Sequence, residues 1–262
     1  MKNRSSLLFG ISMFFVVSCA SGQNFPSSTI ERMKQAVVPI VCVGYRVADK
    51  SVYLISVEGS GFFVREDGDI VTAGHVAKQI FAHARIPVCD VQAIYAPING
   101  WNASNADLPL RVIQITKCWW SDEFDIATCA LEENPFTSAA IKTKPLTADF
   151  ANDVQKDGTP VAFTGFPLST LQPITSQGTV AAYRGVIGDA VGPRELIVDK
   201  NAWPGASGSP IYTSSGEILG LIVERGTDGG SGLAYGRTSA YIKQFLSDNK
   251  IKREKEKQDQ QH

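Results

Sequence analysis

Short apolar or alternating runs, separated by glycine, proline and polar residues, recur along most of the chain. Such runs are too short for helices and are typical of strands joined by turns. They occupy residues 37–47, 52–57, 61–64, 70–75, 93–96, 110–118 and 126–131 in the first half, and residues 160–164, 174–183, 195–198, 211–212 and 218–223 in the second. The segment between the halves, residues 134–153, has two prolines and no sustained period. This pattern predicts an all-β fold of two antiparallel barrels.

Helical signals occur only near the two ends of this pattern and at a single turn after residue 75. Ser27 or Ser28 is a suitable cap for a short helix that ends near Gln35. Residues 238–249 carry apolar side chains at helical spacing and predict a C-terminal helix. The last run, residues 250–262, is charged and polar, and we expect a frayed or disordered tail there.

The composition is that of a globular protein. The 262 residues are 44% hydrophobic and 19% charged, which suffices to form a core. The net charge at pH 7 is −1, so the molecule has no strong positive field. We therefore expect no nucleic-acid partner.

The N-terminal segment is typical of a signal peptide. Lys2 and Arg4 precede an apolar run, residues 7–17, that is too short to persist as a membrane span. Two cleavage sites compete. A lipobox-like sequence ending at Cys19 would leave that cysteine as a lipidated, membrane-attached N-terminus, whereas the small residues on either side of it also fit an ordinary signal peptidase. We favour the lipoprotein, with the first 19 residues acting as the leader. In both cases we expect export to the periplasm, to the outer membrane or to the medium.

Export gives a meaning to the other four cysteines, Cys42, Cys89, Cys118 and Cys129. An even number of cysteines in an oxidising compartment predicts disulfides, and four cysteines allow three pairings. Cys118 and Cys129 flank a predicted hairpin connection, so we favour that pair. The spacings contain no CxxC pair and the chain has three histidines, so we expect no metal site.

A serine between glycines is the strongest chemical signal of the chain. Ser207 lies in the sequence Pro204-Gly-Ala-Ser-Gly-Ser-Pro210. Flanking glycines let the backbone turn tightly and let a substrate carbonyl approach main-chain N–H groups, as an exposed nucleophile with an oxyanion hole requires. An ordinary turn between strands has a similar composition, so this motif alone does not establish catalysis.

Two other residues strengthen the catalytic interpretation. His75 follows a predicted strand, and Asp125 directly precedes another. The chain order His75, Asp125, Ser207 is that of chymotrypsin-type proteases. The neighbours Asp122 and Glu123 lack an apolar pair directly after them, so Asp125 is the better candidate.

The surrounding segments resemble trypsin-like serine proteases of the Htr/Deg type, without a PDZ domain. The matching segments are Glu58–Val64 with Thr72–Val76, Asp125–Ala127, Val161–Pro167 with Gln177–Val180, and Pro204–Pro210 with Gly216–Gly220. They span about residues 37–246 in order. The resemblance implies a chymotrypsin-like protease domain over residues 28–249. Its two Greek-key barrels would cover about residues 37–140 and 154–236, followed by the C-terminal helix.

The resemblance also implies the roles of the site residues. Ser207 would be the nucleophile, His75 the general base and acid, and Asp125 the residue that orients His75. The N–H groups of Gly205 and Ser207 would form the oxyanion hole. No metal or organic cofactor is required, and the substrates would be proteins or peptides.

Substrate specificity follows from the same resemblance. Asn201 and Ala202 would lie at the base of the primary pocket, and Ile222, Val223 and Glu224 would form the wall that pairs with substrate main chain. Asn201 is neutral, so a strict preference for Arg or Lys would lack its usual carboxylate. We expect a small or medium apolar side chain in this pocket.

Two residues depart from the family pattern. Ala206 replaces the Asn or Asp that usually precedes the serine, and Ser209 replaces a glycine. Ala206 removes a side chain that could stabilise the oxyanion loop, and Ser209 adds one behind the nucleophile. They keep a second hypothesis open, a catalytically silent relative that binds proteins at the cell envelope. An esterase of the α/β-hydrolase type fits poorly, because His262 is the only histidine after Ser207.

Overall fold

The computed structural model of the protein spans residues 1–262 and describes residues 25–81, 89–101, 108–185, 191–225 and 232–259. The predicted signal peptide and the candidate lipidation site Cys19 lie outside the described residues.

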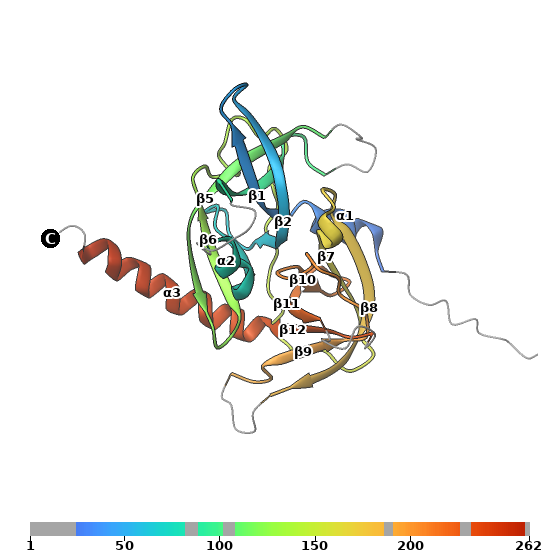
Figure 1. Ribbon diagram of the computed structural model, residues 1–262. Coiled ribbons are helices and arrows are strands. Elements are labelled where there is room, and N and C mark those ends of the chain that lie inside the picture. The colour runs from blue at the N-terminus through green and yellow to red at the C-terminus, as the bar shows by residue number, and fades with distance from the viewer. Residues whose placement is uncertain (1–24, 82–88, 102–107, 186–190, 226–231, 260–262) are drawn as a thin grey trace, which may run out of the picture.

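The first half of the chain forms a closed barrel of six antiparallel strands (Figure 1). They are β1 (Val37–Arg46), β2 (Ser51–Phe63), β3 (Ile70–Ala73), β4 (Val91–Pro97), β5 (Leu110–Ser121) and β6 (Ile126–Leu131). Their order around the barrel is β1-β2-β3-β6-β5-β4, and β4 pairs with β1 to close it. The β-branched residues of β3 and of most of β1 are buried, which explains why these runs are almost wholly apolar.

The second half repeats this arrangement. Its strands are β7 (Pro160–Gly165), β8 (Ile174–Arg184), β9 (Glu195–Val198), β10 (Pro210–Tyr212), β11 (Ile218–Arg225) and β12 (Ala234–Thr238). Read from β7, the order is β7-β8-β9-β12-β11-β10, with β10 paired to β7, as in the first barrel. The predicted fold, all-β with two antiparallel barrels and a C-terminal helix, is confirmed.

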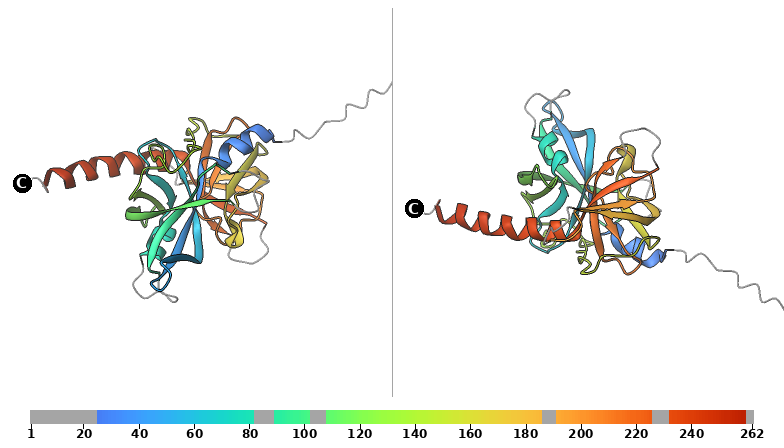
Figure 2. Two further views of the ribbon diagram at one scale, coloured as in Figure 1. Left: turned by 90° about the horizontal axis from the view of Figure 1, so that it is seen from above. Right: turned by 90° about the horizontal axis from the view of Figure 1, so that it is seen from below.

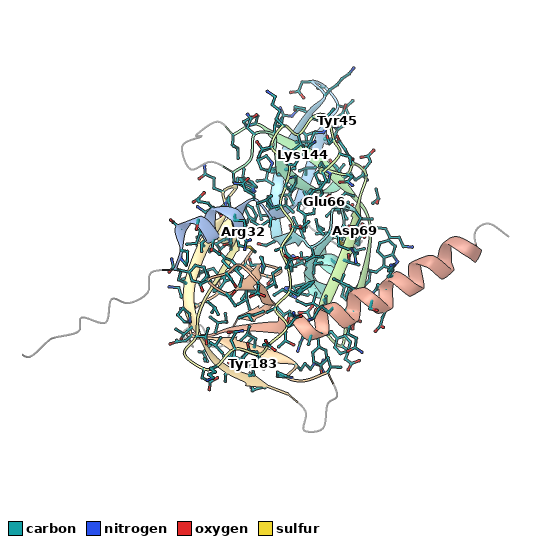
Figure 3. All side chains as sticks on the ribbon, turned by 180° about the vertical axis from the view of Figure 1, so that it is seen from behind. Arg32, Tyr45, Glu66, Asp69, Lys144 and Tyr183 are labelled. Carbon is teal, nitrogen blue, oxygen red and sulfur yellow. A yellow bond between two sulfur atoms is a disulfide. The ribbon has the colours of Figure 1, made fainter. Side chains whose placement is uncertain are left out.

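The helices connect and cover the barrels. They are α1 (Ser27–Lys34), α2 (Gly74–Ile80), the 3-10 turn η1 (Pro167–Ser169) and α3 (Ser239–Asp259). Although α1 precedes the first barrel, it lies against the second, because Thr29 Oγ1 donates to the Ser214 carbonyl at 2.7 Å and Arg32 donates to the carbonyl of Ser215. Figure 3 shows Arg32 on this side of the molecule. The cap of α1 is Pro26 and makes no side-chain bond, so the predicted capping by Ser27 or Ser28 is wrong.

The C-terminal helix is longer than the sequence predicts. It continues to Asp259 and projects beyond both barrels (Figures 1 and 2), whereas we expect a frayed tail after residue 249. Residues 250–257 are almost all Lys, Arg or Glu, which have high helix propensity and alternate in sign at helical spacing. Charge alone is therefore a poor indicator of disorder here.

Two strands also differ from the sequence pattern. β2 is one strand of 13 residues where two are predicted, because its pairing with β1 continues through two register shifts and past Gly59. β12 is not predicted at all. Its buried positions are Ala234, Gly236 and Thr238, which carry too little apolar surface to show an alternating pattern.

The connection between the barrels, residues 132–159, contains no strand and passes behind them, where Lys144 lies (Figure 3). One apolar cluster extends from the first barrel to α3 and β11, so the two halves share a core. The rings of Trp101 and Phe166, one from each half, have centroids 5.2 Å apart. The barrels are therefore packed as a single unit.

Both disulfides involve the first barrel. Cys118 and Cys129 face each other on β5 and β6, which confirms the predicted pair, and Cys42 on β1 is bonded to Cys89. Among the described residues, no helix has the length and apolar character to cross a membrane.

Candidate active site

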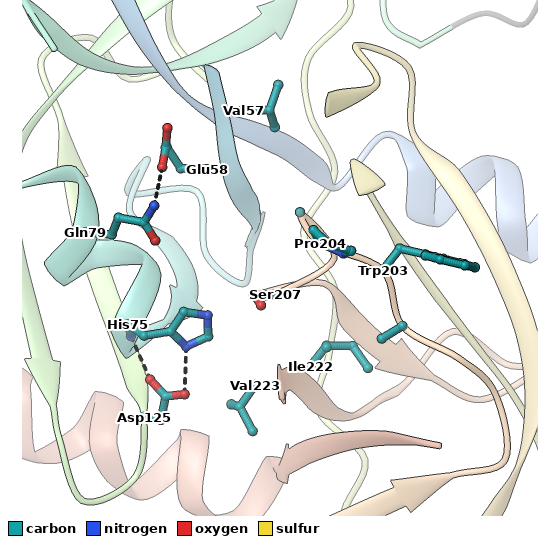
Figure 4. Close-up of a pocket in the computed structure, with 12 residues that line it drawn as sticks. Val57, Glu58, His75, Gln79, Asp125, Trp203, Pro204, Ser207, Ile222 and Val223 are labelled. Carbon is teal, nitrogen blue, oxygen red and sulfur yellow. Dashed lines mark hydrogen bonds and ion pairs between the residues drawn. The ribbon is translucent and has the colours of Figure 1, made fainter. Parts of the chain in front are cut away.

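A cavity of about 640 Å³ lies where the two barrels meet (Figure 4). It is lined by Val57, Glu58, His75, Gln79, Asp125, Ala202, Trp203, Pro204, Gly205, Ser207, Ile222 and Val223. The first five come from the first barrel and its helix α2, and the others come from the second barrel. The structure thus brings His75, Asp125 and Ser207 to one cavity from distant parts of the chain.

His75 is positioned by the end of β3. This strand pairs with β6, and Ala73 lies opposite Ile126, so the first turn of α2 begins beside Asp125. A Cβ on Gly74 would lie 3.0 Å from Asp125 Oδ1 and 3.1 Å from the Asp125 backbone, and glycine leaves the room for this close approach. The register and the glycine together fix where the imidazole meets the carboxylate.

Asp125 contacts His75 through both carboxylate oxygens. Oδ1 accepts from the His75 backbone N–H at 2.7 Å, and Oδ2 lies 2.8 Å from Nδ1 (Figure 4). A carboxylate partner favours a proton on Nδ1, which leaves Nε2 of the neutral ring as an acceptor. The imidazole is therefore held in the orientation and tautomer that suit a general base.

The charge of Asp125 is also stabilised. Burial would by itself raise the pKa of this carboxyl, but the hydrogen bonds and charge of His75, with a smaller effect of Arg237, outweigh burial and lower the pKa below its ordinary value. Arg237 Nε donates to the Phe124 carbonyl at 2.7 Å, which ties the residue before Asp125 to β12. Asp125 is thus ionised at neutral pH.

The loop that carries Ser207 is held by hydrogen bonds to four consecutive carbonyls. The donors to the carbonyls of residues 204, 205, 206 and 207 are, in this order, Leu168 N–H (2.7 Å), Ser60 Oγ (2.8 Å), Ser209 N–H (2.9 Å) and Ser60 N–H (2.8 Å). Gly205 has a φ of 90°. A Cβ there would lie 2.5 Å from the Phe166 carbonyl oxygen, so this position requires glycine.

These bonds determine where the loop N–H groups point. In a trans peptide the N–H is directed away from the preceding carbonyl. The N–H of Gly205 therefore points away from Leu168, and that of Ser207 away from Ser209. Within the part of the chain that the structure describes, neither N–H donates a backbone hydrogen bond. Two unpaired N–H groups at the edge of the cavity are suited to bind an anionic oxygen.

The Ser207 hydroxyl faces the imidazole, whose second ring nitrogen is on the side of Ser207 (Figure 4). No hydrogen bond joins these two side chains among the described contacts. Such bonds are often long in ligand-free enzymes and tighten when substrate binds. The arrangement can support nucleophilic attack by Ser207 after proton transfer to His75.

The predicted specificity residues divide into three groups. Ala202, Ile222 and Val223 line the cavity. Asn201 is exposed and is not one of the lining residues. Glu224 belongs to β11, and its side chain lies outside the described residues.

Several lining residues were not predicted. Trp203 and Pro204 directly precede the nucleophile loop, and Gln79 is one helical turn after His75 on α2. That spacing places Gln79 on the same face of α2 as His75 and was a usable signal. Glu58 accepts from Gln79 Nε2 at 2.9 Å across the cavity wall, a contact that no local pattern indicates.

The comparisons with known proteins agree with this two-barrel fold. A family model described as "Trypsin-like peptidase domain" matches residues 59–221, more than half of the chain. The active form of the Rv3671c protease from M. tuberculosis has a similar fold, with a TM-score of 0.58 and 18% identity, over 92% of this chain and 93% of that one. The inactive form of the same protease gives a TM-score of 0.55 and 17% identity, over 84% and 92%. The comparison with curated proteins found no match.

Proposed function

Because the chain belongs to the family of trypsin-like peptidase domains, we propose that it is a serine endopeptidase that uses His75, Asp125 and Ser207 as its triad. The observation that carries this proposal is the His75–Asp125 pair facing Ser207, in a cavity bordered by the N–H groups of Gly205 and Ser207, which have no backbone partner among the described residues. The substrates of such an enzyme are proteins or peptides.

Acylation would proceed by general base catalysis. Ser207 Oγ attacks the scissile carbonyl carbon while its proton passes to His75 Nε2. The carbon–nitrogen bond then breaks, and Nε2 returns the proton to the leaving amine. Asp125 stabilises the imidazolium without taking up the proton itself.

Hydrolysis of the acyl-enzyme repeats these steps with water as the nucleophile. In both tetrahedral intermediates the negative oxygen would accept from the N–H groups of Gly205 and Ser207. Losing one such donor typically lowers kcat by about 10²–10³. Every proton transfer and every oxyanion contact in these steps is assigned to a group of the chain, and water is the second substrate.

The acyl side of the cleft favours apolar substrates. Ala202, Ile222 and Val223 present apolar surface to the cavity, and Trp203 adds a half-exposed ring at its rim. We propose that a small or medium apolar side chain binds there, with substrate main chain along residues 222–224.

We propose that the enzyme acts outside the cytoplasm. Its two disulfides fit an oxidising compartment, and the leader in the sequence fits export. Cys19 is the proposed site of lipid attachment.

A fluorophosphonate probe tests the proposed nucleophile. The wild-type protein should be labelled covalently and should hydrolyse casein, whereas Ser207→Ala should show neither reaction. Ser209→Ala is the matched control, because it removes the same atom two residues away and should keep both reactions. A wild-type protein that stays unlabelled over pH 5–9, or labelling that persists in Ser207→Ala, would contradict the proposal.

The alternative of a catalytically silent, protein-binding relative gains no support from Ala206 and Ser209, the two residues that depart from the family pattern. Ala206 is buried, and backbone hydrogen bonds hold the loop without a polar side chain at this position. The Ser209 hydroxyl is buried beside Gly165, where a Cβ would lie within 1.8 Å of it, so it is directed into the second barrel and does not crowd the cavity.

A further inference from the structure

We propose that Ser60 is a positioning residue for the oxyanion hole. From β2 of the first barrel, it holds the nucleophile loop of the second barrel in the conformation that aims the Gly205 and Ser207 N–H groups into the cavity. This inference rests on the proposed function and adds to it a residue that does not touch the substrate.

Ser60 is fully buried and uses every polar group that it has. Its four hydrogen bonds are N–H to the Ser207 carbonyl (2.8 Å), Oγ to the Gly205 carbonyl (2.8 Å), Phe166 N–H to Oγ (2.9 Å) and Thr72 Oγ1 to the Ser60 carbonyl (2.7 Å). Two of these bonds reach carbonyls of the nucleophile loop. The Phe166 N–H, which also belongs to the second barrel, donates to the Ser60 hydroxyl and so fixes the orientation of that hydroxyl.

The residues packed against Ser60 at positions 165 and 208 have no room for a side chain. A Cβ on Gly165 would lie 2.5 Å from Ser60 Oγ, and one on Gly208 would lie 2.0 Å from the Ser60 carbonyl oxygen. Gly208 also has a φ of 86°, which side chains rarely allow. These two glycines let the loop approach β2 closely enough to form the bonds.

The loop needs this external support because its own side chains cannot provide it. Gly205 has no side chain, and Ala206 has only a methyl group, so neither can hydrogen-bond the adjacent backbone. The Ser60 hydroxyl fixes the peptide between these two residues. The preceding peptide, which carries the Gly205 N–H, is fixed from the other side by the Leu168 N–H at 2.7 Å.

Removal of the hydroxyl should therefore loosen the oxyanion hole. In Ser60→Ala the Gly205 carbonyl and the Phe166 N–H both lose their partner. The peptide that follows Gly205 is then held only by the bond from the Ala206 N–H to the Trp203 carbonyl (2.9 Å), so its carbonyl can shift. We expect kcat to fall about 10- to 100-fold, since a displacement near 1 Å costs about 10²-fold. KM should stay within about twofold, because ground-state contacts are unchanged.

A transition-state analogue distinguishes a specific loss of the oxyanion hole from a general disturbance of the substrate-binding site. A peptide boronic acid forms a tetrahedral adduct with the serine, and its affinity should fall in Ser60→Ala by the same factor as kcat/KM. The uncleaved substrate peptide, measured on Ser207→Ala with and without Ser60→Ala, should bind equally well to both variants.

Ser209→Ala is the matched control. Ser209 is as fully buried as Ser60 and lies beside it, but its hydroxyl has no hydrogen-bond partner among the described residues. Its removal should leave kcat and the boronic acid affinity within about twofold. Ser60→Cys keeps a donor and acceptor atom at this position, with a weaker and slightly larger thiol in place of the hydroxyl, and should give an intermediate kcat. It is the second variant to measure if Ser60→Ala does not fold.

The outcomes are distinct. A wild-type protein that the fluorophosphonate probe does not label contradicts the proposed function itself. Normal labelling of the wild type, with Ser60→Ala or Ser60→Cys equal to Ser209→Ala in kcat, overturns only the role of Ser60. A loss confined to KM, or an unchanged boronic acid affinity, would overturn it as well.

Discussion

Asp125 combines an unusual backbone with a demanding electrostatic role. Its φ of 51° lies in the left-handed region, which Asp and Asn tolerate better than most side chains. This conformation directs the carboxylate back toward α2, where it meets both the backbone and the ring of His75. Asn is therefore the variant that changes the charge of this residue and keeps its backbone.

We expect Asp125→Asn to fold and to lose activity. Serine proteases with the same triad lose about 10⁴-fold in kcat from this change, because the amide favours the wrong tautomer of the histidine. Steady-state hydrolysis measures this loss, and fluorophosphonate labelling should slow in parallel. Full activity in Asp125→Asn would contradict the assigned role.

The stability of the same variant should depend on pH in a defined direction. The pKa of Asp125 is lower in the folded protein than its ordinary value, so its charge stabilises the fold above that ordinary value, near pH 4. The stabilisation disappears as the pH falls through the lowered pKa. The difference in unfolding free energy between wild type and Asp125→Asn should thus shrink as the pH falls from 5 to 3. Urea unfolding across this range is the measurement, and a difference that grows in acid would contradict it.

Single residues differ in how far along the chain their signals extend. The signals for His75, Asp125 and Ser207 are local, since each residue stands at the end of an apolar run or between glycines. Ser60 has a similar setting between glycines but lies 147 residues before Ser207 in the chain. Its contact with the nucleophile loop exists only after the two barrels pack, so the sequence shows the residue and not the role.

At the scale of elements, strands with a clear apolar run or apolar alternation were predictable, whereas strands rich in glycine and small residues were not. β6 is buried along most of its length and was predicted with the observed bounds. β12 was missed because Gly236 must stay small, as a Cβ there would lie 2.5 Å from Ile211 Cδ1. The length of β2 depends on its pairing with β1, which is a tertiary effect on a glycine-rich stretch.

The Cys118–Cys129 bridge should stabilise the element that carries the aspartate. It joins β5 to β6, and β6 begins one residue after Asp125. The sequence separation of 11 corresponds to about 3 kcal/mol of unfolding free energy in the chain-entropy description. We expect Cys118→Ala/Cys129→Ala to lose up to this amount in urea unfolding. The Cys42–Cys89 bridge closes a loop of separation 47, so the Cys42→Ala/Cys89→Ala variant should lose up to about 4 kcal/mol. Equal stability of the wild type with and without reductant would contradict both values.

At the scale of the whole molecule, the site exists only because the barrels share a core. The helix α3 contributes to it, since Tyr241, Ile242, Phe245 and Leu246 are buried in the cluster that reaches both barrels. The Tyr241 ring lies 5.1 Å from that of Phe124, the residue before Asp125. The C-terminal helix therefore packs against the segment that carries Asp125, a residue of the proposed triad.

This packing predicts which part of α3 matters. Phe245→Ala should destabilise the protein by about 3–5 kcal/mol, as expected for a buried aromatic side chain. Deletion of residues 250–262 removes none of these four side chains and should change the unfolding free energy by less than about 0.5 kcal/mol. Urea unfolding of both variants is the measurement, and a large loss from the deletion would show that the distal helix also packs.

The docking of α1 on the second barrel has a consequence for where such an enzyme could act. Phe25 lies six positions after Cys19 in the sequence, and a stretched chain of that length reaches about 20 Å. An acyl group on Cys19 would thus hold the two barrels within about 20 Å of the lipid headgroups, with α1 facing the membrane. The substrates within its reach would then be polypeptides in a thin layer along the envelope surface. Cleavage after Cys19 would instead release a freely diffusing protease.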